Sequence, residues 1–204
     1  MRGAILDREG ATYLEPGDHP MALLVIGGSQ GAGVFARVVP EALGLLAPEL
    51  RARIRLSQQV RPEDMDRARA AYERMGLAAE LRAFFDDVPE RLAEATLVVS
   101  RAGASSIADI SVIGRPAILV PYPHALDDHQ AANAAGLVSA GGAFMIREEE
   151  LTAEVLAGHI AAILSDPEGA SAMARASRGQ GRPDAVERLA ALVEDLARQE
   201  ELRQ

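Results

Sequence analysis

Three turns, each between an apolar run and a helical pattern, hold the residue types that could do chemistry in this chain. The first turn is Gly27-Gly28-Ser29-Gln30-Gly31-Ala32-Gly33. Glycines let the backbone pass close to a ligand, and the free amides at the start of the following helix attract a phosphate. Ser29 adds a hydroxyl donor. We therefore expect the first turn to bind a phosphate group, although such a turn also serves tight packing alone.

The second turn, Ser100-Arg101-Ala102-Gly103-Ala104-Ser105-Ser106, leads into a helical pattern that carries Asp109. Small residues at the mouth of a helix admit a ligand, and a carboxylate there can accept hydrogen bonds from both hydroxyls of a ribose. An acidic residue near a helix start also complements the helix dipole. Asp109 therefore has a ligand-binding interpretation and a purely structural one.

The third turn runs from Pro121 to Asn133 and opens a helix with a polar cluster. His129 and Asn133 share a helix face at i and i+4, and Gln130 lies three residues before Asn133. Amide and imidazole groups suit neutral hydroxyls, so we expect this turn to bind a sugar. Metal binding is the alternative, because the turn also contains common ligand types. They are His124, Asp127, Asp128 and His129.

Other motifs give alternatives that the sequence disfavours. Asp64-Met65-Asp66 matches the acid-x-acid pattern of one metal-dependent glycosyltransferase class, but it lies at a helix start, where acids complement the dipole. The first turn spells the Gly-x-Ser-x-Gly motif of serine hydrolases, yet the histidine in the right order, His159, falls in mid-helix. NAD binding is disfavoured because the second strand ends Leu56-Ser57-Gln58-Gln59, without an acid for the ribose.

Alternating strands and helices must position these turns. The strand candidates are Met21–Ile26, Ile54–Ser57, Leu97–Ser100 and Ala117–Val120, with weaker ones at Leu81–Phe85 and Ala143–Ile146. They are continuous apolar runs, as in a parallel sheet covered on both faces. Helical patterns lie between them, and a helical tail follows, ending in an amphipathic helix at Asp184–Arg198. The pattern predicts a doubly wound, Rossmann-like α/β domain whose ligands bind outside the carboxyl ends of the strands.

The composition excludes several classes of function. The 204 residues carry 21 basic and 30 acidic side chains, and the net charge of −9 argues against binding nucleic acid through bulk charge. The absence of lysine excludes Walker A loops, pyridoxal phosphate chemistry and Schiff-base aldolases. The absence of cysteine excludes thiol nucleophiles, disulfides and iron–sulfur clusters.

No segment of the sequence has the pattern of a leader or a membrane span. Residues 1–20 are polar and lack the apolar stretch of a signal peptide. No apolar run approaches the ~20 residues that a spanning helix needs. We therefore expect a cytoplasmic protein.

The three turns occur together with other motifs in a fixed order. The motifs are Leu23–Ala32, Phe84–Val88, Ser100–Ala104, Gly114–Ala117 and Asp128–Ala134. In this order and spacing they resemble the C-terminal half of the MurG family, over essentially residues 1–200. The resemblance implies a GT-B fold and an inverting transfer of N-acetylglucosamine from UDP to lipid I, which makes lipid II in peptidoglycan synthesis.

The resemblance also implies ligand-binding residues. The diphosphate would lie on the first turn, uracil on the backbone of Phe85 and the ribose at Asp109. The residues expected around the nucleotide are Arg2, Gly28, Ser29, Gln30, Gly31, Phe85, Gly103, Ala104, Ser105, Ser106, Ile107, Ala108 and Asp109. Those expected around the N-acetylglucosamine are His129, Gln130 and Asn133. No metal and no other cofactor is implied.

The resemblance further divides the chain into a former interdomain linker at 1–20, a nucleotide-sugar-binding domain at 21–182 and a C-terminal helix at 183–204. The family's N-terminal domain, with the acceptor site and the proposed base, is absent, so we expect the chain alone to be inactive. A separate acceptor-domain subunit is then a possible partner, and a non-catalytic nucleotide-sugar-binding module is the alternative. The full family is peripheral on the cytoplasmic face of the inner membrane.

Three features depart from the family pattern: Asp109, Gly33 and the segment Ser57-Gln58-Gln59-Val60, which stands where the family often has His-Gln-Ser/Thr-Gly. Asp109 stands where the family usually has a glutamate, and it is one methylene shorter. Gly33 stands where the family often has a basic residue. The first departure bears on the expected ribose contact.

Overall fold

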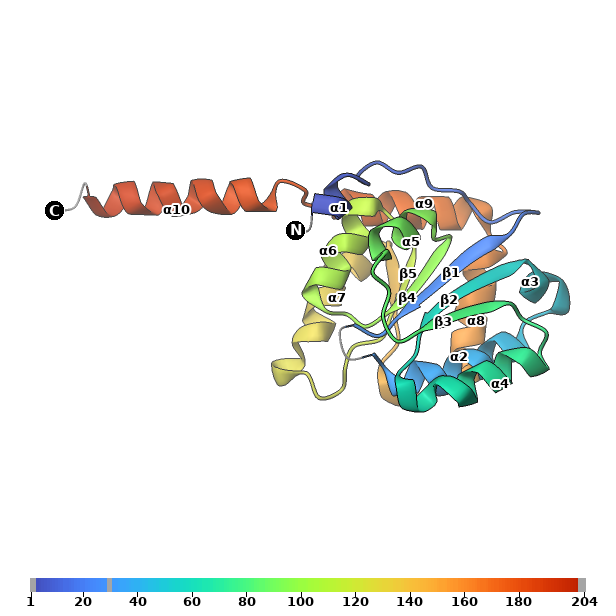
Figure 1. The fold of residues 1–204 in the computed structure, drawn as a ribbon. Helices are drawn as coiled ribbons and strands as arrows, with labels where there is room; N and C mark the ends of the chain where they lie inside the picture. The colour runs from blue at the N-terminus through green and yellow to red at the C-terminus, as the bar shows by residue number, and fades with distance from the viewer. Residues whose placement is uncertain (1–2, 29–30, 202–204) are drawn as a thin grey trace.

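The computed structural model describes residues 3–28 and 31–201, in which six strands form one parallel sheet (Figure 1). The strands are β1 (Met21–Ile26), β2 (Ile54–Gln59), β3 (Ala79–Arg82), β4 (Leu97–Ser100), β5 (Ala117–Leu119) and β6 (Ala143–Met145). Their order across the sheet is β3-β2-β1-β4-β5-β6, and neighbouring strands run parallel. The predicted doubly wound α/β fold is confirmed.

Helices cover both faces of the sheet (Figure 1). One apolar cluster joins the sheet to α2 (Gly33–Leu45), α3 (Pro48–Arg53), α4 (Met65–Arg74) and α8 (Ala153–Leu164). A second cluster joins it to α1 (Gly3–Leu6), α5 (Val88–Glu94), α6 (Ala104–Ile113) and α7 (His129–Ser139). The helix α9 (Pro167–Gly179) packs against both α6 and α8. The central strands thus lie between two apolar layers, which explains their continuous apolar sequences.

The core surrounds β1, one of the two central strands of the sheet. Leu23 pairs in register with Leu56 of β2 on one side and with Leu97 of β4 on the other, and all three side chains are buried. The chain leaves β1 toward β2 and leaves β4 toward β5, on opposite sides of the sheet. These diverging connections create the topological switch point at which open α/β sheets bind ligands.

The strand expected at Leu81–Phe85 is wrong by several residues, because β3 spans Ala79–Arg82. The chain leaves the sheet after Arg82, and the two phenylalanines belong to the loop that leads to α5. The apolar pair at 84 and 85 resembles strand sequence, but only Phe85 is buried, and it is covered by Arg91 and not by a neighbouring strand. The short helices α1 and α3 were also not expected.

The last helix, α10 (Ala185–Glu201), extends away from the rest of the chain (Figure 1). Its expected amphipathic pattern is present, and its apolar residues Val186, Leu189, Leu192 and Val193 are exposed. Among the described residues, no helix is both long and apolar enough to cross a membrane.

Candidate functional site

A cavity of about 850 Å³ opens at the topological switch point, where the carboxyl ends of β1 and β2 meet the start of α6. Its size lies in the range of small-molecule sites, about 300–1,000 Å³. Its walls are mostly apolar, with a few polar groups. The lining residues are Ile26, Gly28, Gln59, Phe84, Phe85, Val88, Ser105, Ser106, Ala108, Asp109 and Ala185.

The cavity brings together many of the residues expected around the nucleotide. Those in its wall are Gly28, Phe85, Ser105, Ser106, Ala108 and Asp109. Gly103 is the N-cap of α6 and Ala104 its first residue, whereas Ile107 packs against the apolar core. Gly31 follows in the glycine-rich turn, outside the cavity wall. Arg2, Ser29 and Gln30 lie outside the described residues.

The described part of the first turn requires glycine. A Cβ atom at Gly27 would lie 2.2 Å from the backbone nitrogen of Ala32, so no larger residue fits there. Gly28 and Gly31 have φ angles of 81° and 67°, which side-chain-bearing residues rarely adopt. The Gly27 amide donates a 3.0 Å hydrogen bond to Oε1 of Gln59, which fixes the turn to the end of β2.

The two helices that follow the first and second turns have no side-chain cap, a feature that they share with α4, α5 and α7. The N-caps of α2 and α6 are Ala32 and Gly103, and neither makes a side-chain cap hydrogen bond. By contrast, Thr152 caps α8 and Asp166 caps α9 through their side chains. Uncapped N-terminal amides carry a partial positive charge and are available to an anionic ligand.

Asp109 supplies a carboxylate to the cavity. It lies on α6, its side chain is only 4% exposed, and it belongs to the cavity wall together with Ser105 and Ser106. A carboxylate can accept two hydrogen bonds from neighbouring hydroxyls. The position therefore fits the ribose contact that was expected from the sequence, which remains a prediction.

The third turn contacts the second through amide side chains. Oε1 of Gln130 accepts hydrogen bonds from the backbone amides of Ala102 (3.2 Å) and Tyr122 (3.0 Å). Nδ2 of Asn133 donates to the carbonyl of Ala102 at 3.4 Å. Both residues lie on α7 and outside the cavity wall, so their first structural role is to join the loops after β4 and β5.

The backbone is strained where α7 begins. Asp127 and Asp128 have φ angles of 50° and 52°, and such left-handed conformations cost non-glycine residues roughly 1–3 kcal/mol each. The carboxylate of Asp128 pairs with Arg147 at 2.9 Å. Nδ1 of the exposed His129 lies 2.7 Å from the carbonyl oxygen of Leu126. Strain of this kind is concentrated at functional sites.

The alternative sites find less support. No group of three or more histidine and acidic side chains gathers within residues 3–28 and 31–201, so the metal set of the third turn is not assembled there. His159 lies in α8 with its ring 4.8 Å from that of Phe144. Asp64 pairs with Arg67 on α4 at 2.7 Å.

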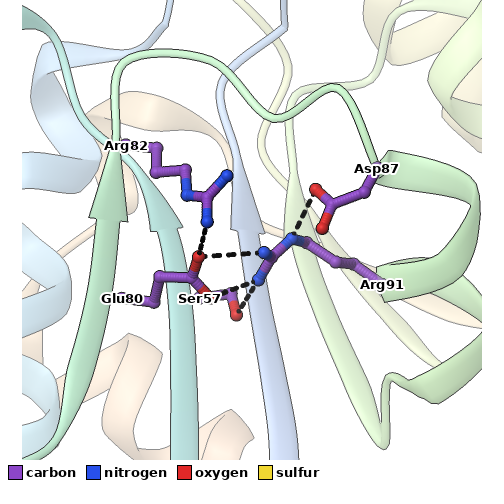
Figure 2. A network of polar contacts seen from close by, with 5 residues as sticks. All are labelled: Ser57, Glu80, Arg82, Asp87 and Arg91. Carbon is purple, nitrogen blue, oxygen red and sulfur yellow. Dashed lines mark hydrogen bonds and ion pairs between the residues drawn. The ribbon is translucent and has the colours of Figure 1, made fainter.

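The sequence analysis missed an ionic network behind the cavity wall (Figure 2). Arg91 donates to Asp87 (2.8 Å), to both carboxylate oxygens of Glu80 (2.7 and 3.0 Å) and to Oγ of Ser57 (2.8 Å). These hydrogen bonds hold the pKa values of Glu80 and Asp87 below their usual range. The i, i+4 spacing of Asp87 and Arg91 is the one sequence signal that predicts part of the network.

Arg101 was also missed as a functional element of the second turn. Its side chain is buried, donates to the carbonyls of Val120 and Pro121, and forms an ion pair with Glu148. Its guanidinium lies 5.4 Å from the ring of Phe35 and 5.5 Å from that of Tyr122. Arg101 therefore joins the loops after β4 and β5, as Gln130 does from α7.

Comparisons with known proteins agree with this geometry. The family model of the glycosyltransferase family 28 C-terminal domain matches residues 22–189. The chain is 52% identical over 199 residues to the UDP-N-acetylglucosamine--N-acetylmuramyl-(pentapeptide) pyrophosphoryl-undecaprenol N-acetylglucosamine transferase of Rhizobium etli, and 49% identical over 194 residues to that of Rhodospirillum rubrum. These matches cover 97% and 95% of the chain, but only 53% and 50% of the relatives.

A solved structure is similar to this chain over about half of its own length. The crystal structure of Acinetobacter baumannii MurG matches with a TM-score of 0.80 and 28% identity. The match covers 90% of this chain and 55% of that one. The chain thus spans about half the length of the relatives it matches.

Proposed function

Because the chain belongs to the family of glycosyltransferase family 28 C-terminal domains, we propose that it is the half of a transferase that binds UDP-N-acetylglucosamine. The single observation that carries the proposal is the cavity at the switch point, in which Phe85, Asp109 and the start of α6 come together. The cavity has the size of a small-molecule site and a carboxylate in an otherwise mostly apolar wall.

We assign each part of the donor to one part of this edge. Uracil lies against the backbone of the Phe85 loop, the ribose hydroxyls donate to Asp109, and the diphosphate faces the glycine-rich turn with the uncapped N-terminus of α2. The sugar lies toward α7, where Oε1 of Gln130 is engaged by backbone amides. Nε2 of Gln130 is the donor that this side chain offers to a sugar hydroxyl.

The proposed reaction is an inverting glycosyl transfer to lipid I, which yields lipid II. The acceptor oxygen forms a bond to the anomeric carbon, the bond from that carbon to the UDP oxygen breaks, and the acceptor proton passes to a base. This chain acts on the leaving group, because helix N-terminal amides stabilise the negative charge that develops on UDP. We place the base and the lipid acceptor site in the half of the relatives that this chain does not match.

This division has consequences for activity, partners and location. The chain alone is proposed to bind donor without transferring the sugar, and to need an acceptor-binding half, in the same protein or as a separate subunit. Its diphosphate contacts are proposed to need no metal, so EDTA should leave donor affinity unchanged. Because the relatives are named for a pyrophosphoryl-undecaprenol acceptor, we propose that the whole protein works at the cytoplasmic face of the inner membrane.

Isothermal titration of the purified chain tests the proposal. UDP-N-acetylglucosamine should bind, and UDP-glucose, UDP-N-acetylgalactosamine and NAD should compete poorly. Asp109→Asn should weaken binding by about 10- to 100-fold, the cost of one charged hydrogen bond. Asp66→Asn, which changes an exposed aspartate on α4, is the matched control and should bind as the wild type does. Absence of binding to any uridine nucleotide would overturn the proposal.

A further inference from the structure

We propose that Arg91 is a positioning residue that fixes the Phe85 loop in the shape that selects the nucleobase. The inference rests on the proposed function, because it concerns the same cavity, and it adds a residue outside the cavity wall. It is carried by the contacts of Arg91 with β2, with β3 and with the N-cap of its own helix (Figure 2), and by its contact with the ring of Phe85.

The two phenylalanines of the loop have opposite environments. Phe85 is 2% exposed, whereas Phe84, its neighbour in the chain, is 66% exposed at the cavity. Both residues line the cavity, so whatever fixes the buried ring also restrains the backbone that joins them. A base that is recognised by backbone groups depends on their position to a fraction of an ångström.

Arg91 holds the buried ring. Its guanidinium carbon lies 4.2 Å from the centroid of Phe85, within the distance for a cation–π contact. Arg82 lies farther away, at 5.9 Å, and its side chain is 50% exposed against 14% for Arg91. Arg91 is therefore the principal cation behind the loop.

The other contacts of Arg91 prevent its guanidinium from moving. The hydrogen bonds to Glu80 connect it to β3 and that to Ser57 connects it to β2, while that to Asp87 returns to the N-cap of its own helix, α5. A planar guanidinium that donates in several directions has one orientation that satisfies all of its partners. Arg91 is thus a rigid support beneath the Phe85 ring.

The hydrogen bonding of the Asp87 side chain supports a positioning role for Arg91. Asp87 is the N-cap of α5, and an aspartate at this position usually accepts a hydrogen bond from the first turn of its own helix. Here its side chain makes no cap hydrogen bond and accepts from Nε of Arg91 instead. The Asp87 carboxylate is therefore part of the network that supports the loop.

The near end of the loop is fixed separately. Nε2 of Gln59 donates to the carbonyl of Ala83 at 3.2 Å, while its Oε1 accepts from the Gly27 amide. Removal of Arg91 therefore leaves Ala83 and the glycine-rich turn in place and releases only the part of the loop around Phe85. This predicts a loss of base selectivity without a loss of diphosphate binding.

The experiment compares three ligands on the full chain: UDP, ADP and inorganic pyrophosphate. Arg91→Ala should weaken UDP binding about tenfold, the effect of roughly one lost hydrogen bond, and reduce the preference for UDP over ADP by a similar factor. Pyrophosphate affinity should stay unchanged. Arg53→Ala, which breaks the 3.0 Å ion pair with Asp18 at the amino edge of the sheet, is the matched control and should alter none of the three affinities.

A second variant separates positioning from folding. Arg91→Lys keeps the charge but loses the planar fork, so it should fold, as judged by its thermal transition, and still lose selectivity for UDP. If Arg91→Ala fails to fold, the lysine variant decides. Wild-type selectivity in the folded variants, or an equal fall in UDP and pyrophosphate affinity, would overturn the inference. If the wild-type chain binds no UDP, the proposed function itself fails, which is a distinguishable result.

Discussion

The two edges of the sheet use arginine in different ways. At the carboxyl edge, beside the cavity, Arg91 and Arg101 form ion pairs with carboxylates. At the amino edge, Arg115 is fully buried and donates to backbone carbonyls. The carbonyls belong to Ala11, Thr12, Leu92, Ala93, Ile113 and Gly114.

The carbonyls that accept hydrogen bonds from Arg115 explain how its buried charge is tolerated. Several lie at the C-terminal ends of α5 and α6, where helix dipoles are negative and carbonyls lack partners within the helix. Burial, together with the nearby Arg178, lowers the pKa of Arg115 to about 10, so it remains charged at neutral pH. Arg115 is therefore a charged structural residue at neutral pH, whereas the partners of Arg91 at the carboxyl edge are carboxylates, which titrate.

The largest effect is expected at the amino edge. Arg115→Met should lower the free energy of unfolding by about 3–5 kcal/mol, because it leaves several buried carbonyls without donors. Urea denaturation measures the loss. UDP affinity of the folded variant should match the wild type, because Arg115 is outside the cavity wall. A loss below about 1 kcal/mol would contradict the structural role.

A smaller effect is expected at the carboxyl edge from Gln130→Ala. The variant leaves the amides of Ala102 and Tyr122 without their acceptor, which should cost about 1–2 kcal/mol of unfolding free energy. It should also weaken UDP-N-acetylglucosamine binding more than UDP binding in calorimetry. Gln180→Ala, at an exposed glutamine after α9, serves as control. An equal loss of affinity for both ligands would show that Gln130 does not contact the sugar.

Low pH should separate the two edges. The folded-state pKa values of Glu80 and Asp87 are lowered, so their stabilising contribution is complete above the unfolded values near 4 and is lost as the pH falls through the lower folded values. UDP affinity should therefore fall below about pH 4. In Asp87→Asn it should be weaker at neutral pH and should vary less with pH, as measured by titration with circular dichroism as the folding control. The same pH dependence in the variant would contradict the assignment.

The smallest effect is expected from Arg8→Ala. The pair between Arg8 and Glu90 is 3.0 Å long, but both side chains are more than 40% exposed. Such exposed pairs contribute about 0–1 kcal/mol, so stability should change little and UDP affinity not at all. A large change in stability or in UDP affinity would show that the exposed Arg8–Glu90 pair affects the cavity.

Much of the fold was predictable because apolar runs report burial directly. The runs at Met21–Ile26 and Leu97–Ser100 became β1 and β4 with unchanged boundaries. The strand predicted from the run ending at Phe85 was misplaced, because a buried loop phenylalanine has the same local sequence signal as a strand residue. The Phe85 ring is covered by the guanidinium of Arg91, which lies on a helix that begins after the loop.

The site was predictable to a smaller extent. Glycine spacing and helix position led to Gly28 and Asp109, which both lie in the cavity wall. The contributions of Gln59 and Phe84 depend on which side chains the sheet order brings to one place, and no local pattern carries that information. For the same reason the network of Ser57, Glu80 and Arg91 was missed, since it joins two strands and a helix.

The central claim is that the carboxyl-edge cavity binds the donor nucleotide. A crystal structure of the chain with UDP-N-acetylglucosamine tests it most directly. The account predicts the uracil against the Phe85 loop, the ribose hydroxyls at Asp109 and the sugar toward Gln130. A donor bound elsewhere, or a cavity that stays empty at saturating donor, would contradict it.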